Sequence, residues 1–250
     1  MSRTNAIGRT IFDVPGSCLV VLSGGLDSTT LLAMLHREPK CHRIEAVTFD
    51  YGQRHGSAEI GSALLIADTY NIPHSMVEIP RLFSRSPIVN LEEEVPVNED
   101  YHRIGVAPTY VPRRNTVFLA LAAAIAEQKG LAAVAYGAHN TDSNYPDCSR
   151  MFAEAMNLAL IVGSDQLHPV RLFAPFIGLD KDDIVRKAAS LRVPVSLTHS
   201  CYQGLTPACG ICDTCQARIM SFKVAGFIDP IEYEIDIDWG TASEFPEPKE

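Results

Sequence analysis

The sequence predicts an α/β protein with a doubly wound parallel sheet and a C-terminal zinc-binding segment. Short apolar, β-prone runs alternate along the chain with longer helical patterns, an order that favours parallel strands with helices on both faces of the sheet. The first run ends in Ser-Gly-Gly-Leu-Asp-Ser, at residues 23–28, where a helical pattern begins. Ligands in such sheets bind beyond the carboxyl ends of the strands. The metal-binding segment is predicted by four cysteines within residues 201–215.

The predicted elements follow from the period of the apolar residues. The strongest helical pattern spans 114–128, and Asp180 is a candidate N-cap for the helix that follows it. The predicted strands are 18–22, 44–49, 75–79, 133–136 and 170–173, and the predicted helices are 28–36, 58–70, 114–128, 152–162 and 181–191.

Length and composition limit the class of protein. The 250 residues fit a domain over 1–195, a four-cysteine segment over 196–235 and a flexible acidic tail over 236–250. A net charge of −9 argues against strong, non-specific nucleic-acid binding. The longest apolar run, 117–126, is about half of the roughly 20 residues that a membrane helix needs. Since no secretory h-region precedes residue 16, we expect a cytoplasmic protein that does not enter a membrane.

The stretch after the first strand has the residues of a phosphate-binding loop. Gly24 and Gly25 allow a tight turn, and the free N–H groups of the following helix attract an anion. Ser23 and Ser28 add hydroxyl donors, and Asp27 is a candidate Mg²⁺ ligand. An ordinary strand-to-helix turn would explain the glycines but not the whole set. The stretch resembles the pyrophosphate (PP) loop of the N-type ATP pyrophosphatases, which cleave ATP between the α and β phosphates.

The cysteine spacing indicates a metal site. Cys201, Cys209, Cys212 and Cys215 form C-x7-C-x2-C-x2-C, and thiolates at such spacing can converge on one tetrahedral zinc. An iron–sulfur cluster is an alternative because C-x2-C-x2-C also occurs in ferredoxins. Buried thiols without metal are a further alternative. A four-thiolate zinc would be structural, holding a segment that lacks a core of its own.

Together, the loop and the cysteines resemble the 7-cyano-7-deazaguanine synthase family of queuosine biosynthesis. The resemblance covers residues from about 18 to 233 and is carried by further motifs. These are Phe-Asp-Tyr-Gly-Gln-Arg-His at 49–55, Tyr-Val-Pro-Arg-Arg-Asn at 110–115, Tyr-Pro-Asp-Cys at 145–148, Leu-Asp-Lys-Asp-Asp-Ile at 179–184 and Ser-Cys-Tyr at 200–202.

This resemblance implies an ATP-dependent ligase that forms homodimers. The family converts 7-carboxy-7-deazaguanine and free ammonia to the nitrile in two steps. The carboxylate is adenylated and ammonia displaces AMP to give the amide. The amide oxygen is then adenylated, and loss of AMP gives the nitrile.

The resemblance also implies roles for individual residues. The expected catalytic residues are Asp27, Arg114, Lys181 and His55. The expected ATP-binding residues are Ser23, Gly24, Gly25, Leu26, Asp27, Ser28 and Phe49, and the expected substrate-binding residues are Asn115, Asp147 and Arg150. Two have structural alternatives: Arg114 as half of a surface ion pair, and His55 as a structural histidine.

Three departures from the family pattern are predicted to cluster on the pocket for the base. Ser149 takes the place of an arginine after Tyr-Pro-Asp-Cys, with Arg150 next and Met151 in place of an acid. His199 takes the place of a tryptophan, and the block 137–142, which includes His139, departs from G-x-N-x-x-D.

The departures leave other functions open. One is a related ligase that stops at the amide or transfers the adenylated acid to another amine, on a protein or nucleic acid. Another is sulfur transfer to tRNA, which the acidic charge and the clustered cysteines disfavour. A third is a non-catalytic nucleotide-binding scaffold, against which the complete loop motif argues.

Overall fold

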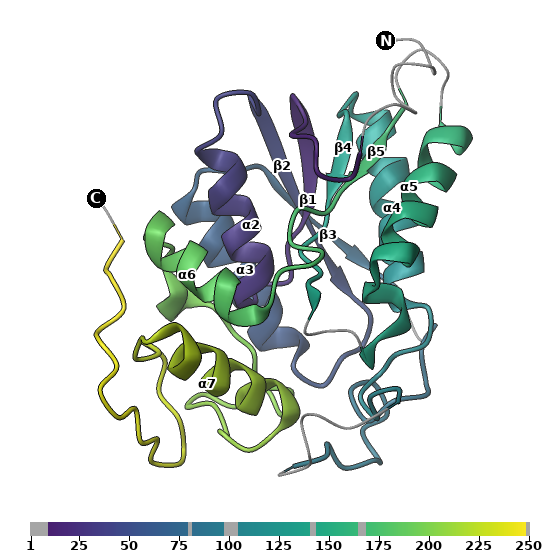
Figure 1. Ribbon diagram of the computed structural model, residues 1–250. Coiled ribbons are helices and arrows are strands. Elements are labelled where there is room, and N and C mark those ends of the chain that lie inside the picture. The colour runs from purple at the N-terminus through teal and green to yellow at the C-terminus, as the bar shows by residue number, and fades with distance from the viewer. Residues whose placement is uncertain (1–9, 80–81, 98–104, 141–143, 165–168, 249–250) are drawn as a thin grey trace.

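One parallel sheet with helices on both faces forms the centre of the molecule (Figure 1). The computed structural model describes residues 10–79, 82–97, 105–140, 144–164 and 169–248. The strands lie in the order β3-β2-β1-β4-β5, and every pairing is parallel. They are β1 (Ser17–Val21), β2 (Arg43–Asp50), β3 (His74–Glu78), β4 (Ala133–Ala135) and β5 (Arg171–Phe173). The predicted fold class is confirmed.

The helices alternate with these strands, as the sequence predicts. They are α2 (Leu26–His36), α3 (Gly56–Thr69), α4 (Arg114–Gln128), α5 (Arg150–Gly163), α6 (Lys181–Leu191) and α7 (Asp213–Ala225), with short 3₁₀ turns at Pro146–Cys148 and Val195–Leu197. The five predicted helices and five predicted strands have boundaries within about two residues of the observed ones, the usual uncertainty of element ends. Helix α7 is not among the predicted elements. None of the helices in the described ranges is both long and apolar enough to cross a membrane.

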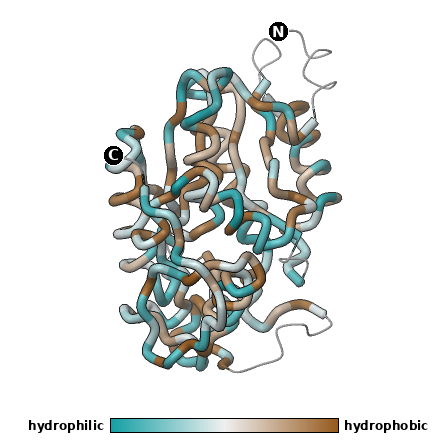
Figure 2. Tube along the Cα trace, turned by 60° about the vertical axis from the view of Figure 1, so that its left-hand side comes forward, coloured by the Kyte–Doolittle hydropathy of each residue, from teal (hydrophilic) through white to brown (hydrophobic). Residues whose placement is uncertain are grey.

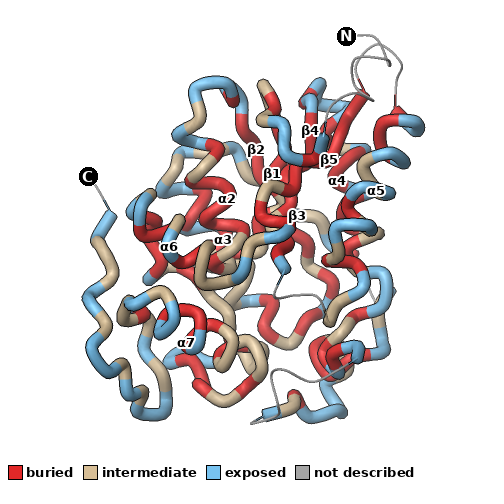
Figure 3. Tube along the Cα trace, viewed as in Figure 1, coloured by how far each residue is buried: buried red, intermediate tan, exposed pale blue. Residues whose placement is uncertain are grey.

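Alternate residues of β1 pack against different helices. Leu19 lies in a core cluster with residues of α4 and α5, whereas Cys18 and Val20 lie in a second cluster with residues of α2, α3 and α6. The strands other than the edge strand β3 are largely buried, while the outer turns are exposed (Figure 3). Apolar runs recur along the trace between hydrophilic turns (Figure 2). Because both faces of the central strands are covered, β1 and β4 are apolar on both faces.

The strand order creates a crevice at the carboxyl end of β1. The chain passes from β1 outward to β2 and β3, and then returns to the other side of β1 as β4 and β5. Connections that leave neighbouring strands in opposite directions open a crevice at their carboxyl ends, the usual ligand site of such sheets. The loop at residues 22–25, between β1 and α2, lies at this position.

The last part of the chain packs on α2 and α6 through α7. Phe222 of α7 belongs to a buried cluster with residues of both helices, and Trp239 and Phe245 pack against it. The tail (yellow in Figure 1) is also held by the Ile228 N–H, which donates to the Ser243 carbonyl at 2.8 Å. The described tail therefore contacts the domain, although none of residues 236–248 is buried, and its flexibility stays a prediction. The predicted domain boundaries stay predictions.

Candidate functional site

The loop after β1 is shaped by close packing and by an uncapped helix. Gly24 has φ +77°, and a Cβ there would lie 2.4 Å from the Glu59 backbone oxygen, so only glycine fits. Gly25 is the N-cap of α2 and supplies no side-chain hydrogen bond to the helix. The first N–H groups of α2 therefore keep their capacity to bind an anion. The hydroxyls of Ser23 and Ser28 lie 3.0 Å apart beside them.

Asp27 is the centre of a charged group drawn from three elements. Its Oδ2 accepts a hydrogen bond from the Lys181 Nζ at 2.9 Å and lies 3.5 Å from the His139 Nε2. Burial alone would raise the pKa of Asp27, but Lys181 and His139 outweigh it and hold that pKa well below its usual range. Asp27 Oδ1 is buried and accepts no hydrogen bond from the residues that the structure describes. An ionised carboxylate with one unused oxygen is suited to a metal cation.

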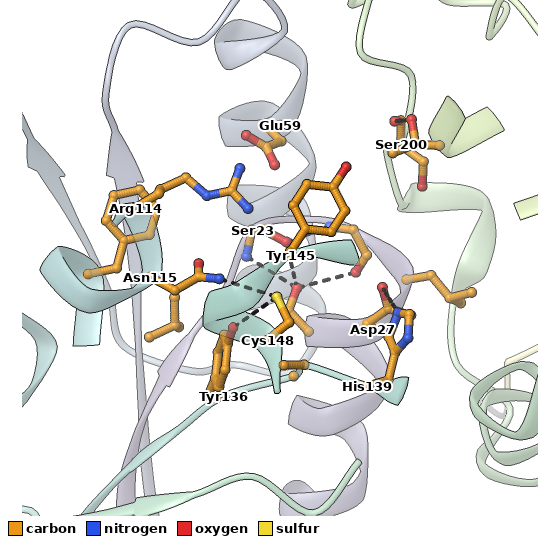
Figure 4. Close-up of a pocket in the computed structure, with 18 of the residues that line it drawn as sticks. Ser23, Asp27, Glu59, Arg114, Asn115, Tyr136, His139, Tyr145, Cys148 and Ser200 are labelled. Atoms are coloured by element: carbon orange, nitrogen blue, oxygen red, sulfur yellow. Dashed lines mark hydrogen bonds and ion pairs between the residues drawn. The ribbon is translucent and has the colours of Figure 1, made fainter. Parts of the chain in front are cut away.

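A cavity of about 270 Å³ lies at the carboxyl ends of the strands (Figure 4). Its walls come from the β1–α2 loop, the end of β2, the first turns of α3 and α4, the segment after β4 and the cysteine segment. The expected site residues that line it are Ser23, Gly25, Leu26, Asp27, Ser28, Phe49, His55, Arg114, Asn115 and Lys181.

Arg114, the first residue of α4, and His55, directly before α3, both line this cavity. An Arg114 Nη1–H donates to the Tyr51 hydroxyl at 3.1 Å, and the guanidinium lies over the same ring, 5.7 Å from its centroid. Arg114 therefore forms no surface ion pair among the described residues. His55 is 3% exposed, and burial lowers its pKa, which favours the neutral imidazole. Its Nε2 lies 3.6 Å from the Glu59 Oε2.

Asp147, an expected substrate ligand, instead holds the start of α4. Its Oδ2 accepts the Asn115 backbone N–H at 3.1 Å, and the residue is 5% exposed and does not line the cavity. The Asn115 side chain donates to the Cys148 sulfur at 3.4 Å and does line the cavity. Helix α4 begins after Arg113, which is left-handed and supplies no cap. The Asp147 carboxylate provides the missing cap.

Arg150, another expected substrate ligand, points away from the cavity. It pairs with Glu154 at 2.8 Å while its side chain is 68% exposed. Ser149, in the family's arginine position, caps α5, since its Oγ accepts the Phe152 N–H at 3.1 Å. Met151 is 80% exposed. Position 149 therefore serves the helix in this chain, and Arg150 does not replace the missing side chain.

The other two departures lie beside the β1–α2 loop and line the same cavity, and their predicted place on a base pocket stays a prediction. His139 contacts Asp27, and the His199 N–H donates to the Gly24 carbonyl at 2.9 Å. The reason is topological: the segment after β4 passes against the start of α2, where a Cβ on Gly137 would meet Ser28 N at 3.3 Å. Thr141 and Asp142 of the same block lie outside the described residues.

The four cysteines form one buried group. Their sulfur atoms all lie within 4.8 Å of one another, and a tetrahedral site with 2.3 Å bonds has sulfur atoms about 3.8 Å apart. The Cys212 N–H donates to the Cys209 sulfur at 3.4 Å, a contact that stabilises negative charge on sulfur. The group fits a metal ion.

A buried ion pair joins the cysteine segment to the chain after α7. Two Arg218 N–H groups donate to the Asp229 carboxylate, at 2.6 and 3.0 Å, and Arg218 also reaches the Thr198 and Ser200 hydroxyls. Tyr233 donates to the same carboxylate at 2.7 Å. Because Ser200 lines the cavity, this network fixes one of its walls.

Several cavity residues are not predicted from the sequence. Tyr51 and Glu59 lie in or just after the 49–55 motif. His139 is predicted only as a departure near the base pocket; it follows the end of β4, and its place at the carboxyl end of a strand is the signal for its contact with the loop. Tyr136 and Tyr202 carry no comparable signal in the sequence.

The sheet order and the loop together define a class. A parallel sheet with a glycine turn at its switch point, an uncapped helix and an aspartate–lysine pair in the adjoining cavity describes an α/β protein of the PP-loop type. Residues 17–226 match the family described as Queuosine biosynthesis protein QueC. The chain belongs to the QueC family.

Named relatives support this membership over nearly their whole length. The chain is 42% identical over 223 residues to the 7-cyano-7-deazaguanine synthase of Caldicellulosiruptor bescii, covering 88% of this chain and 99% of the relative. Proteins of the same name from Thermoplasma volcanium and Methylococcus capsulatus are 40% and 41% identical, covering 88% and 86% of this chain and 92% and 97% of the relatives.

A solved structure is a weaker match. It is the U34-tRNA thiolase NcsA from Methanococcus maripaludis with its [4Fe-4S] cluster, at TM-score 0.43 and 15% identity over 79% of this chain and 62% of that chain. A likeness at this level bears on neither the fold nor the metal of the cysteine group.

Proposed function

We propose that this protein is a 7-cyano-7-deazaguanine synthase. It would convert 7-carboxy-7-deazaguanine and ammonia to the nitrile with two molecules of ATP. The observation that carries the proposal is the Ser-Gly-Gly-Leu-Asp-Ser loop, which lines a cavity with Asp27 and Lys181 in a chain of the QueC family. A ligase that stops at the amide is not favoured, because the relatives over 86–88% of the chain carry the name of the synthase.

The loop is proposed to hold the phosphates of ATP. Backbone N–H groups from Gly24 to Leu26 and the hydroxyls of Ser23 and Ser28 would face the β and γ phosphates. Asp27 would hold Mg²⁺, which supplies charge neutralisation on the phosphates when it is bound. The unused Oδ1 of Asp27 supports this role.

Arg114 and Lys181 are proposed to stabilise charge on the α phosphate. The substrate carboxylate attacks the α phosphorus, forming a P–O bond, and pyrophosphate leaves with the electrons of the broken bond. Ammonia then forms a C–N bond as AMP departs. The amide oxygen repeats the attack on a second ATP with release of pyrophosphate, and loss of AMP and of both amide protons leaves the nitrile. Cations aimed at the transferred phosphorus suit both adenylation steps.

The other proposed contacts are those to the adenine and to the deazaguanine substrate. Phe49 lines the cavity and stacks on Phe118 with ring centroids 4.5 Å apart, so its ring is a core contact and the adenine would meet its edge. Asn115 and His55 would orient the substrate. Asp147 and Arg150 receive no substrate role, given their positions.

Zinc, a homodimer and a cytoplasmic location are further proposals. Zinc is supported by four convergent sulfur atoms.

The dimer is supported by an exposed apolar stripe on α5, with Met151, Leu158 and Val162 at helical spacing and exposures of 80%, 54% and 54%. Light scattering of the wild type and of Met151→Glu would test it. The cytoplasm is supported by seven cysteines without a disulfide.

Mass spectrometry of the products tests the main proposal. Protein, ATP, magnesium, ammonia and 7-carboxy-7-deazaguanine should give the nitrile with two AMP per turnover. AMP with an amide that accumulates would show the alternative ligase, and a reaction without AMP would exclude both.

A further inference from the structure

The cavity contains an acidic side chain that the proposed mechanism does not use. Glu59 lies on the first turn of α3, lines the cavity and has an 18% exposed side chain. Its Oε2 accepts the Gln53 Nε2–H at 2.9 Å and lies 3.6 Å from the His55 Nε2. Its Oε1 has no hydrogen-bond partner among the described residues. One carboxylate oxygen is therefore positioned by the protein, and the other is open.

A negative charge at this position is unfavourable for the binding of the proposed substrates. ATP and a carboxylate substrate are both anions, so an uncompensated carboxylate in their cavity opposes their binding. The cavity's cations are directed elsewhere, since Lys181 pairs with Asp27 at 2.9 Å and Arg114 donates to Tyr51 at 3.1 Å. No described lysine or arginine pairs with Glu59. The arrangement suits a cationic ligand that arrives with the anions.

The surroundings of Glu59 favour a small monovalent cation. Mg²⁺ prefers six oxygen ligands in octahedral geometry, whereas a single open oxygen is offered here. A guanine edge is recognised by a carboxylate through two parallel hydrogen bonds, which need both oxygens. The rings of Tyr51 and Tyr202 line the same cavity, and aromatic faces attract ammonium-type cations. We propose that Glu59 forms the binding site for the ammonium ion that supplies the nitrogen.

This inference rests on the proposed function and places the nitrogen beside the reacting carbon. The Tyr51 hydroxyl contacts Arg114, which is proposed to face the transferred phosphate. An ion between Glu59 and Tyr51 would thus lie next to the adenylated carboxyl group. Loss of one proton to solvent leaves ammonia, whose lone pair forms the C–N bond as the C–O bond to AMP breaks, and a second proton is lost from the nitrogen to give the amide. Glu59 acts by binding and positioning the nitrogen.

The test separates the KM values of the three substrates. Glu59→Gln keeps the size of the side chain and removes its charge. It should raise KM for ammonium about 10- to 100-fold, the effect of one lost charge-assisted hydrogen bond, with kcat recovered at saturating ammonium. KM for ATP and for the deazaguanine substrate should stay within about twofold of wild type. Asp68→Asn, which removes an exposed acid on the same helix, should change none of them.

Other outcomes overturn the inference. An unchanged ammonium KM excludes the site, and a raised KM for the deazaguanine substrate alone shows recognition of the base instead. A parallel rise in all three KM values with a lower melting temperature shows a structural role. Because the wild type is assayed alongside, failure of this site with normal nitrile formation is distinct from failure of the proposed function, in which the wild type makes no nitrile.

Discussion

The two regions that enclose the cavity are held together in different ways. The β1–α2 loop is fixed by the backbone: β1 pairs with β2 along its length and with β4 through its central residues, and a Cβ at Gly24 would clash with α3. The cysteine segment has no strand in the sheet and relies on buried side chains, namely the sulfur atoms near Cys212 and the Arg218–Asp229 pair. Both regions line the same cavity.

This difference teaches where each region is vulnerable. A site built on strand ends keeps its shape when one side chain is removed, so mutations there should change chemistry and leave the fold intact. A segment held by an ion pair and by the proposed metal would lose its shape when either is removed. Changes there should reduce stability and activity together, because Ser200 and Thr214 form part of the wall.

The largest expected effect is on turnover. Asp27→Ala should lower kcat about 10³-fold or more, because it removes the proposed metal ligand and the partner of Lys181. Metal content and melting temperature should stay close to wild type, which steady-state assays and thermal unfolding would check. Wild-type turnover would remove the magnesium role, and a collapsed fold would break the contrast between the two regions.

Loss of the metal should have the next largest effect. Cys212→Ala should release the ion and increase amide hydrogen exchange over residues 196–235, while β1 stays protected. Activity should fall as the wall loosens. Elemental analysis would identify the metal, and retention of one ion per chain in the variant would show that the ligand set is wrong. Cys18→Ser, at a buried cysteine outside the group, is the control for loss of a thiol.

The buried Arg218–Asp229 ion pair allows the stability of the cysteine segment to be tested without changing a cysteine. Arg218→Met leaves Asp229 buried without its charged partner and should lower the free energy of unfolding by about 3–5 kcal/mol. Urea denaturation would measure it. Arg186→Met, at a half-exposed arginine that pairs with Asp182, should cost at most about 1 kcal/mol. Equal losses in the two variants would contradict the role given to the buried pair.

The smallest effects are expected at the family departures on α5. Ser149→Ala should cost about 1 kcal/mol through the lost N-cap. Arg150→Ala should leave every substrate KM within about twofold, because its exposed pair with Glu154 contributes little. A large rise in KM for the deazaguanine substrate in Arg150→Ala would restore the substrate role that the sequence suggests.

Local sequence accounts for most of the elements. Apolar runs bounded by turns predict the strands, and the two glycines before an uncapped helix predict the β1–α2 loop. Helix α7 is not predicted because its buried face carries Arg218, Ser221 and Cys215 along with Ile219 and Phe222, so the usual apolar period is interrupted. The contacts of the tail are not predicted because its anchors are isolated aromatics in an acidic stretch.

The sequence by itself determined the fold class, the phosphate-binding loop and the cysteine group, because each depends on residues close together in the chain. Only the tertiary structure decided which distant side chains meet. Asp27 and Lys181 are 154 positions apart, and His139 joins them because β4 lies beside β1. The same packing turned Asp147 into a helix cap and Arg150 toward solvent. Strand order sets these contacts, and it depends on how the layers pack over the whole chain.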